Sequence, residues 1–317
     1  MLIYIAKRLM VALPTLLIVS MLVFGLQMLL PGDPVLAMAG EERDPETLAR
    51  IREQLHLDDP VPVQYLRWLG GVVTGDLGTS LRTGEPVSQL IVQKLPVTIQ
   101  LAVMSMIFAM LIGIPAGIIA AVRKGSVTDW LANFVALSGL SIPNFWLGIM
   151  LILLVSVNLG WLPSMGAGPG GSQDWQWDWA HMRHLVLPAV TLAVVPIGIV
   201  ARTVRALAGD ILSMDFVTAL YAKGLSRGDV LRHVARNAAA TALSVMGLQL
   251  GYLLGGSILI ETVFNWPGSG FLLSNAIFQR DLPLLQGTIL VLAMFFVGMN
   301  LIVDVAQAAI DPRVKRN

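Results

Sequence analysis

Residues 97–122 read VTIQLAVMSMIFAMLIGIPAGIIAAV, a run without a single charged side chain. A helix needs about 20 consecutive, mostly apolar residues to cross the hydrocarbon core of a bilayer. This stretch is long enough, so it predicts a membrane span and determines the class of the fold.

Similar apolar stretches occur on both sides of this one, at 9–30, 130–157, 186–207, 241–263 and 286–308. The chain is 56% hydrophobic and only 13% charged, whereas soluble domains carry about a quarter charged residues. Lys7 and Arg8 before the first run resemble a signal peptide, but the run exceeds the usual apolar region of about 7–15 residues. We therefore expect an all-α membrane protein with six transmembrane helices, the first of them retained.

The spans divide the chain into an N-terminus with its first span (1–30), a polar segment (31–96), five further spans (97–308) and a tail (309–317). The polar segment holds ten acidic and six basic residues. Asp44 followed by Pro45 is typical of a helix start, and short helices are expected near 45–55 and 61–74. The absence of cysteine excludes disulfides, thiolate metal sites and a catalytic thiol.

The orientation follows from the basic residues, because Lys and Arg accumulate in cytoplasmic loops. They cluster before span one, after span two, around the loop 208–240 and at the chain end: Lys7, Arg8, Arg123, Lys124, Arg202, Arg205, Lys223, Arg227, Arg232, Arg236, Arg313, Lys315 and Arg316. We therefore expect both termini and the loop 208–240 in the cytoplasm, and the acidic segment 31–96 outside. An interfacial belt is expected at Trp161, Trp175, Trp177, Trp179 and Trp266.

Four prolines fall inside predicted spans, at positions 14, 115, 143 and 196. Neighbouring helices can satisfy the carbonyls that a proline leaves free, so these residues are compatible with membrane helices. They predict either simple kinks or hinges for a gating motion.

The loop 208–240 is patterned as two helices with a tight turn. Phe216 with Leu220, and Val217 with Tyr221, give four-residue spacings that predict a short helix with apolar flanks. Gly224 fits a left-handed C-terminal cap. Ser226 and Asp229 fit a capping box that begins a second helix. Such order beneath a membrane indicates a docking element.

This loop resembles that of the ATP-binding-cassette importer permeases, and within them the peptide/nickel group. The resemblance rests on Asp215-Phe216, AKGLS at 222–226, His233, Val234 and Arg236-Asn237-Ala238. It continues in other motifs along nearly the whole chain: LPGDP at 30–34, GDLGTS at 75–80, SIPNFWLG at 141–148, GWLPSMG at 160–166, GLQLGYLLGGSILIETVFNWPGSG at 247–270, NLIVD at 300–304 and DPR at 311–313.

There are departures from the family pattern. The family motif begins with Glu-Ala-Ala, where this chain has Thr218, Ala219 and Leu220. Leu220 stands where a small residue is usual, and it could enlarge the apolar contact with a partner or shift its register. Arg236-Asn237 replaces the family's Leu-Pro ending, as is common in the peptide group.

The resemblance implies the core of a type I importer permease that works with other subunits. Its partners would be a homologous second permease in a heterodimer, two ATP-binding subunits, an external substrate-binding protein and membrane lipid, with no nucleic acid. ATP and Mg would bind the ATPase subunits, and this chain would hold no cofactor. The ATPase-coupling loop would comprise Asp215, Phe216, Ala219, Leu220, Ala222, Lys223, Gly224, Leu225 and Arg236.

Two patterns compete with this interpretation. Residues 224–228 match the Gly-x-Ser-x-Gly nucleophile pattern, but that motif needs a strand before it, and a loop between spans supplies none. His181 and His184 are three residues apart, yet two histidines without nearby thiolate or carboxylate ligands make a weak metal site. No Gly-x-x-x-x-Gly-Lys-Ser/Thr loop occurs, so phosphate-loop ATP binding is not expected in this chain, which is predicted to be no enzyme.

Polar residues within spans are costly in lipid, so they are candidates for function. Asn144, Gln249, Ser257 and Glu261 are candidates for a translocation pathway, although Glu261 could instead cap the outer loop. Asp304 is expected to pair with a basic residue near the cytoplasmic face. The glycine repeats at 113 and 117, and at 247, 251 and 255, predict close helix packing, either within the subunit or against a second one.

The predicted function is import of di- or oligopeptides across the bacterial cytoplasmic membrane. Glutathione or nickel permeases of the same group are alternatives. A stand-alone secondary transporter would usually show an inverted repeat and buried acidic relays, and neither is clear in this sequence. An intramembrane enzyme would need a nucleophile or metal constellation, which the sequence lacks.

Overall fold

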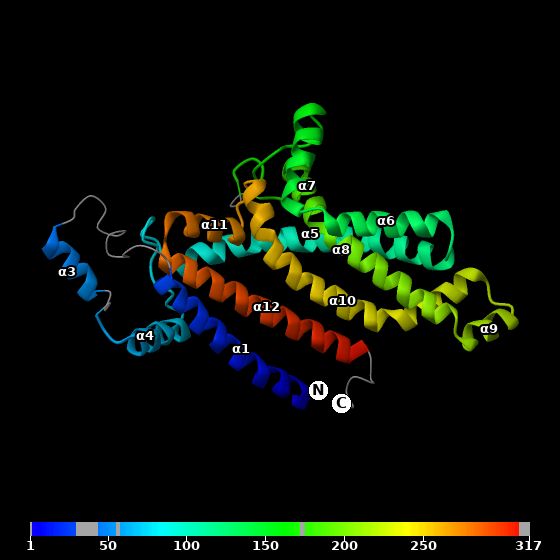
Figure 1. Cartoon of the computed structure of the whole chain (residues 1–317), viewed down its shortest axis with the longest axis horizontal. Coiled ribbons are helices and arrows are strands. Elements are labelled where there is room, and N and C mark those ends of the chain that lie inside the picture. Colours follow the sequence, from blue (N-terminus) through cyan, green and yellow to red (C-terminus); the bar gives the residue numbers. More distant parts are fainter. Residues whose placement is uncertain (1, 30–43, 55–57, 172–174, 311–317) are drawn as a thin grey trace.

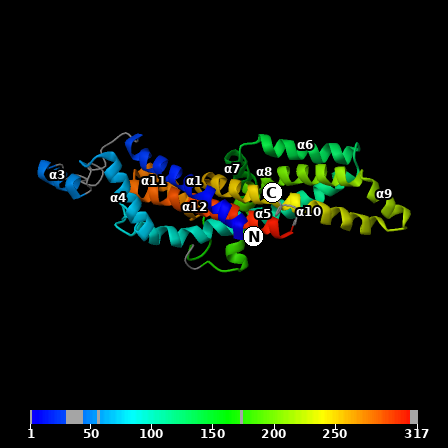
Figure 2. The ribbon, with the colours of Figure 1, turned by 90° about the horizontal axis from the view of Figure 1, so that it is seen from below.

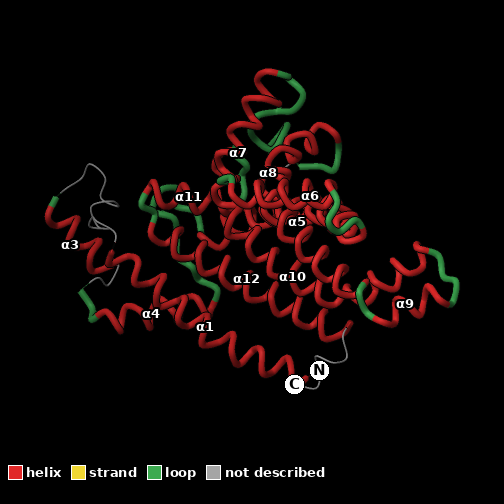
Figure 3. Tube along the Cα trace, turned by 45° about the vertical axis from the view of Figure 1, so that its right-hand side comes forward, coloured by secondary structure: helices red, strands yellow, loops and turns green. Residues whose placement is uncertain are grey.

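The computed structural model describes residues 2–29, 44–54, 58–171 and 175–310. Their regular structure is helical, apart from one isolated bridge between Thr79 and Pro86 (Figure 3). The helices are α1 (Leu2–Leu29), α3 (Pro45–Gln54), α4 (Val61–Thr74), α5 (Val87–Val122), α6 (Val127–Ser141), α7 (Asn144–Leu151), the π-helix η1 (Ile152–Asn158), α8 (Trp179–Leu212), α9 (Asp215–Ala222), α10 (Arg227–Val263), α11 (Ser269–Gln279) and α12 (Leu282–Ile310). The motifs at 30–34 and 311–313 and the tail from 311 lie outside the described residues.

The long helices form an elongated bundle with different short helices at its two ends (Figure 1). The short helix α9 lies at one end, and α3, α4 and α11 lie toward the other. The view from below shows the same division (Figure 2). These ends are called the α9 end and the α11 end.

Most of the predicted spans correspond to helices of suitable length and composition. Two whole helices, α5 and α8, and parts of two others, Val245–Val263 of α10 and Leu282–Ala306 of α12, are long and apolar enough to cross a membrane by themselves. The pair α6 and α7–η1 adds a broken fifth span, and α1 carries the apolar stretch Met10–Leu26. The expected all-α membrane fold is therefore confirmed. Helices α5, α8 and α10 also extend well beyond the spans predicted within them.

The prediction of one continuous span over 130–157 is wrong. The two halves, Val127–Ser141 and Asn144–Asn158, meet at an angle of 101°. Proline lacks an N–H and disfavours helical geometry in the residue before it, and Ile142 is accordingly extended, with φ −86° and ψ 126°. Pro143 thus separates two helices, with α7 projecting from the bundle (Figures 1 and 3), whereas Pro14, Pro115 and Pro196 lie inside theirs.

Helices α5 and α8 make the most extensive helix–helix contact. A Cβ on Gly117 would overlap the carbonyl oxygen of Ala201 and the side chain of Val204, so only glycine permits this approach. Gly247 and Gly251 similarly face α12. Because apolar surface gains little from leaving lipid, such close packing is what holds membrane helices together. Four of the five repeated glycines therefore serve contacts within the subunit, while Gly255 faces open space.

The polar segment before α5 is fastened to the bundle at the α11 end. Tyr65 of α4 packs edge-on against Phe24 of α1, and its hydroxyl lies 2.8 Å from that of Ser20. Further along, the Ser80 hydroxyl donates to the buried carboxylate of Asp281, at 2.5 Å, just before α12. These contacts orient the segment after residue 58 relative to α1 and α12.

One part of the predicted tryptophan belt is wrong. Trp266 is completely buried, and its indole N–H donates to the carbonyl of Val97. It belongs to the apolar cluster that also holds Val97 and Leu101 of α5, and the helix α11 that follows it was not predicted. Trp161, Trp177 and Trp179 are each about two-thirds exposed, in agreement with an interfacial position.

Candidate functional site

The turn after α9 is closed by backbone hydrogen bonds that require a left-handed residue. Gly224 has φ +80°, a conformation that strains residues with a Cβ. Its N–H donates to the carbonyl of Tyr221, and the N–H of Leu225 donates to that of Leu220. This pair of bonds is a Schellman motif, which satisfies carbonyls at the helix end. The predicted glycine cap is confirmed.

The next helix begins at once, at Ser226. The Ser226 hydroxyl accepts from the N–H of Asp229 at 3.2 Å and donates to the Asp229 carboxylate at 2.6 Å. This confirms Ser226 as the N-cap of α10. A residue used in this way, with a helix rather than a strand before it, does not form a nucleophile elbow.

The inner face of α9 is fixed by an apolar cluster. Val217 packs with Ile211 of α8 and with Val230 and Val234 of α10, and all four are at least nine-tenths buried. Leu220 and Leu225 pack partly against the same cluster. Leu220, which the sequence suggested could enlarge a contact with a partner, lies against the subunit itself.

The outer face of α9 is exposed and largely apolar. Met214, Phe216 and Tyr221 are 48%, 39% and 47% exposed. The remaining members of the predicted coupling loop that are also exposed are Asp215, Ala219, Ala222, Lys223, Gly224 and Arg236. A short helix that is rigid on one face and apolar on the other can insert as a knob into a groove of another protein.

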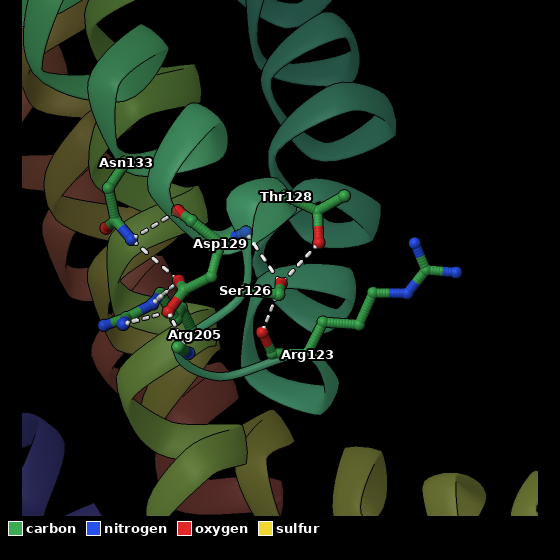
Figure 4. Close-up of polar contacts among 7 residues, drawn as sticks. Arg123, Ser126, Thr128, Asp129, Asn133 and Arg205 are labelled. Atoms are coloured by element: carbon green, nitrogen blue, oxygen red, sulfur yellow. Dashed lines mark hydrogen bonds and ion pairs between the residues drawn. The ribbon is translucent and has the colours of Figure 1, made fainter.

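A partly buried ion pair anchors the helix that leads into α9 (Figure 4). Arg205 of α8 donates to both carboxylate oxygens of Asp129 in α6, at 2.5 and 2.9 Å. Asn133 and the N–H of Gly125 also donate to this carboxylate. Asp129 is 5% exposed, so all its acceptors are used inside the protein. The cluster joins the end of α5, the start of α6 and α8.

Sequence reasoning missed this ion pair. Ser126 and Asp129 are spaced as a helix start, and Ser126 does cap α6. Arg205, however, is 76 residues away from Asp129, and nothing local indicates that the two meet. A second ion pair was expected: Asp304 lies 3.1 Å from Arg8 of α1, so its predicted pairing with a basic residue is confirmed.

Glu261, one of the four pathway candidates, is completely buried. Its Oε2 accepts from the N–H of Phe271 at 2.9 Å, within the first turn of α11. A carboxylate at this position satisfies a free helix amide and complements the helix dipole. Glu261 therefore supports α11, which is the outer-loop role that the sequence left open.

The other three candidates are separated by the structure. Gln249 is 8% exposed and Ser257 is fully buried, so both lie inside the subunit with Glu261. Asn144 lies instead at the first position of α7, beside the break, and its Nδ2 is 3.4 Å from the hydroxyl of Tyr252 in α10. The structure thus brings Asn144 together with a residue that the sequence had not singled out.

His181 and His184 contact the loop that precedes α8. The His181 ring nitrogens lie 2.6 Å from Asp178 and 2.9 Å from the carbonyl of Pro169, and His184 contacts the carbonyl of Met165. The side chain of His181, and then its backbone N–H, hold the pKa of Asp178 below its usual value. Within the described part of the chain, no three metal-ligating side chains come together.

Comparison with known proteins agrees with this architecture. A family model described as binding-protein-dependent transport system inner membrane component matches residues 113–316. A second model, for the N-terminal part of such membrane components, matches residues 1–102. Together they cover the two halves of the chain.

Curated relatives match along almost their whole length. The glutathione transport system permease protein GsiC of Escherichia coli K12, like that of Salmonella paratyphi A, is 43% identical over 316 residues, covering 99% of both chains. The dipeptide transport system permease protein DppB of Alkalihalophilus pseudofirmus is 40% identical over 332 residues, covering 99% of this chain and 100% of DppB.

Among solved structures, the inward-facing MetNI methionine ABC transporter is similar, with a TM-score of 0.57 and 18% identity. The likeness covers 70% of this chain and 97% of that one. At this identity it supports the fold alone.

Proposed function

The chain belongs to the binding-protein-dependent transport system inner membrane components, and we propose that it is the permease subunit of an ATP-driven peptide importer. Relatives that are 40–43% identical over nearly the full chain carry dipeptide or glutathione in their names, and both solutes contain peptide bonds. Peptides are therefore the proposed substrates. Nickel, also expected as an alternative, has no such support among these relatives.

The observation that carries the mechanism is the two-faced helix α9. Its inner face is fixed by Val217 and Leu220, and its outer face presents Phe216 and Tyr221 to a partner. A force applied to the outer face moves α8 and α10 directly, because α9 is joined to both by tight turns. We assign this helix as the coupling element that docks into a groove of an ATPase subunit.

In the proposed assembly this chain pairs with a homologous second permease to form a heterodimer. Two ATPase subunits bind ATP and Mg, and an external binding protein delivers the peptide; this chain needs no cofactor of its own. ATP binding favours one of two permease arrangements, and docked α9 transmits that preference to the spans. The permease step is alternating exposure of a pathway and needs no covalent chemistry.

The proposed orientation places the α9 end in the cytoplasm. Basic residues gather there from separate parts of the chain, including Arg8 at the start of α1, Arg123 after α5, and Lys223 and Arg227 beside the turn. The positive-inside rule assigns this end, and with it both termini, to the cytoplasmic side. The segment 31–96 is then external.

Site-specific cross-linking tests the proposal, because the chain has no cysteine to remove. Phe216→Cys, in the complex with its ATPases and second permease, should cross-link to an ATPase subunit. Phe278→Cys is the matched control, since Phe278 is 82% exposed on α11 at the other end. Two results would exclude the coupling role. One is a cross-link from Phe278→Cys, but not from Phe216→Cys, to an ATPase subunit. The other is that no ATPase subunit co-purifies with the chain.

Uptake by the reconstituted assembly then tests the substrate. ATP-dependent accumulation of dialanine, trialanine or glutathione in proteoliposomes is expected. If none of these accumulates while the ATPases remain bound to the chain, the peptide assignment is wrong and the permease assignment stands.

A further inference from the structure

Polar groups on the exposed faces of the spans fall into two kinds. The hydroxyls of Thr15, Ser141 and Thr262 each donate to the carbonyl four residues earlier in the same helix. A hydroxyl satisfied in this way can face lipid at little cost. These residues need no further explanation.

Asn144 and Tyr252 belong to the second kind, because their polar groups meet between helices. Asn144 Nδ2 donates to the hydroxyl of Tyr252 across the α7–α10 contact, at 3.4 Å, and Tyr252 is 41% exposed. Within the described part of the chain, Asn144 Oδ1 is buried without a hydrogen-bond partner. Such an unpaired buried oxygen is costly, and the carboxamide is therefore incompletely satisfied in this arrangement.

The break between α6 and α7, beside this pair, also leaves polar groups outside the regular hydrogen bonding. The first main-chain bond of α7 runs from the N–H of Leu147 to the carbonyl of Pro143, so the amides of residues 144–146 precede the helical ladder. Interrupted backbone at membrane depth is tolerated only where protein or a water-filled cavity covers it. The exposed face around Asn144 and Tyr252 is thus unsuited to lipid.

A pathway that forms between two permease subunits must be lined by groups exposed on each separate subunit. That condition excludes buried Gln249, Ser257 and Glu261 in this arrangement and retains Tyr252. On the same face of α10, Leu248 and Leu259 are exposed, and a Cβ on Gly255 would meet nothing within 4 Å. The hydroxyl of Tyr252 thus lies on a face that is otherwise apolar, next to the open space at Gly255.

The hydrogen-bond direction determines what this hydroxyl can do. Asn144 Nδ2 has only hydrogens to give, so Tyr252 Oη accepts that bond and its own proton remains free to donate. We propose that Tyr252 contacts the substrate in the pathway by donating to a peptide carbonyl oxygen, and that Asn144 is the positioning residue that orients it. This inference rests on the proposed function as a peptide permease.

The test compares a peptide with its thioamide analogue, because sulfur accepts hydrogen bonds more weakly than oxygen. Uptake of trialanine, and of trialanine with one thioamide, is measured in proteoliposomes holding the complete importer. Tyr252→Phe should lower uptake of trialanine about threefold to tenfold, the worth of one neutral hydrogen bond. It should change uptake of the analogue much less, so that the preference for the oxygen peptide shrinks.

Asn144→Leu should shrink the same preference by disorienting the hydroxyl. Thr262→Val is the matched control. It removes an exposed hydroxyl of α10, the helix of Tyr252, and this hydroxyl already donates to the carbonyl of Ile258, so the preference for the oxygen peptide should stay unchanged. Equal losses for both peptides in Tyr252→Phe would indicate a packing role and overturn the proposal, as would unchanged uptake. If wild-type protein imports neither peptide, the substrate class fails first, and this inference falls with it.

Discussion

The α9–α10 turn and the α6–α7 break are both abrupt changes of chain direction, but they differ in how their polar groups are satisfied. At the turn, Gly224 and Ser226 close the helix ends with local hydrogen bonds. At the break, Pro143 interrupts the ladder and Asn144 Oδ1 has no partner among the described residues. The closed turn therefore suits the proposed role of receiving force from a partner, whereas the break suits a place where substrate or another subunit supplies the missing contacts.

Removing the left-handed residue of the turn should have the largest effect. In Gly224→Val, a β-branched residue must adopt φ +80°, which costs about 1–2 kcal/mol and disrupts the Schellman bonds. Most peptide uptake should be lost while the ATPases still hydrolyse ATP and the chain still inserts. Gly224→Asn is the control, since asparagine tolerates this conformation, and it should keep much of the uptake. Normal transport by Gly224→Val would contradict the rigid-turn interpretation.

Repairing the break should affect function more than stability. Pro143→Ala restores an N–H and removes the clash that prevents a continuous helix. We expect the 101° bend to open and uptake to fall, with thermal stability unchanged or raised. Spin labels can be attached to cysteines at exposed Phe134 and Leu153, on either side of the break. Straightening of the bend would lengthen the distance between the two labels. A distance that stays the same would show that packing, and not Pro143, holds the angle.

Weakening the start of α10 should have a moderate effect. Ser226→Ala removes the cap from the Asp229 N–H, at an expected cost of about 0.5–2 kcal/mol. The thermal midpoint of the detergent-solubilised complex should fall slightly, and Ser226→Asp should restore it because aspartate also caps helices. A fall of the same size in Ser226→Asp would show that the cap is unimportant and that the hydroxyl acts otherwise.

The smallest effect is expected from the N-terminal cap of α8. There Asp178 accepts a hydrogen bond from the N–H of His181. Because the pKa of Asp178 is lowered in the folded protein, its ionised form stabilises the fold above the unfolded pKa of about 3.9. That stabilisation is lost as pH falls through the lower, folded pKa. The wild-type protein should thus have a higher melting temperature than Asp178→Asn at neutral pH. The difference in melting temperature should disappear in strong acid. A difference that grew on acidification would contradict this assignment.

The sequence by itself determined the features that depend on neighbouring residues. Apolar run length located the apolar helices, although not the break at Pro143. The spacing of Gly224, Ser226 and Asp229 predicted the turn, because caps join groups three to five residues apart. The resemblance of the motifs then identified the family, which the family models and relatives confirm.

Only the tertiary structure decided the features that join distant parts of the chain. Arg205 with Asp129, Asn144 with Tyr252 and Ser80 with Asp281 are separated by 76, 108 and 201 residues. Local sequence indicates that such groups are polar, but which of them meet depends on how the helices pack. The same reason explains why Trp266 is in the core and Glu261 supports α11, while Tyr252 is left to face the proposed pathway.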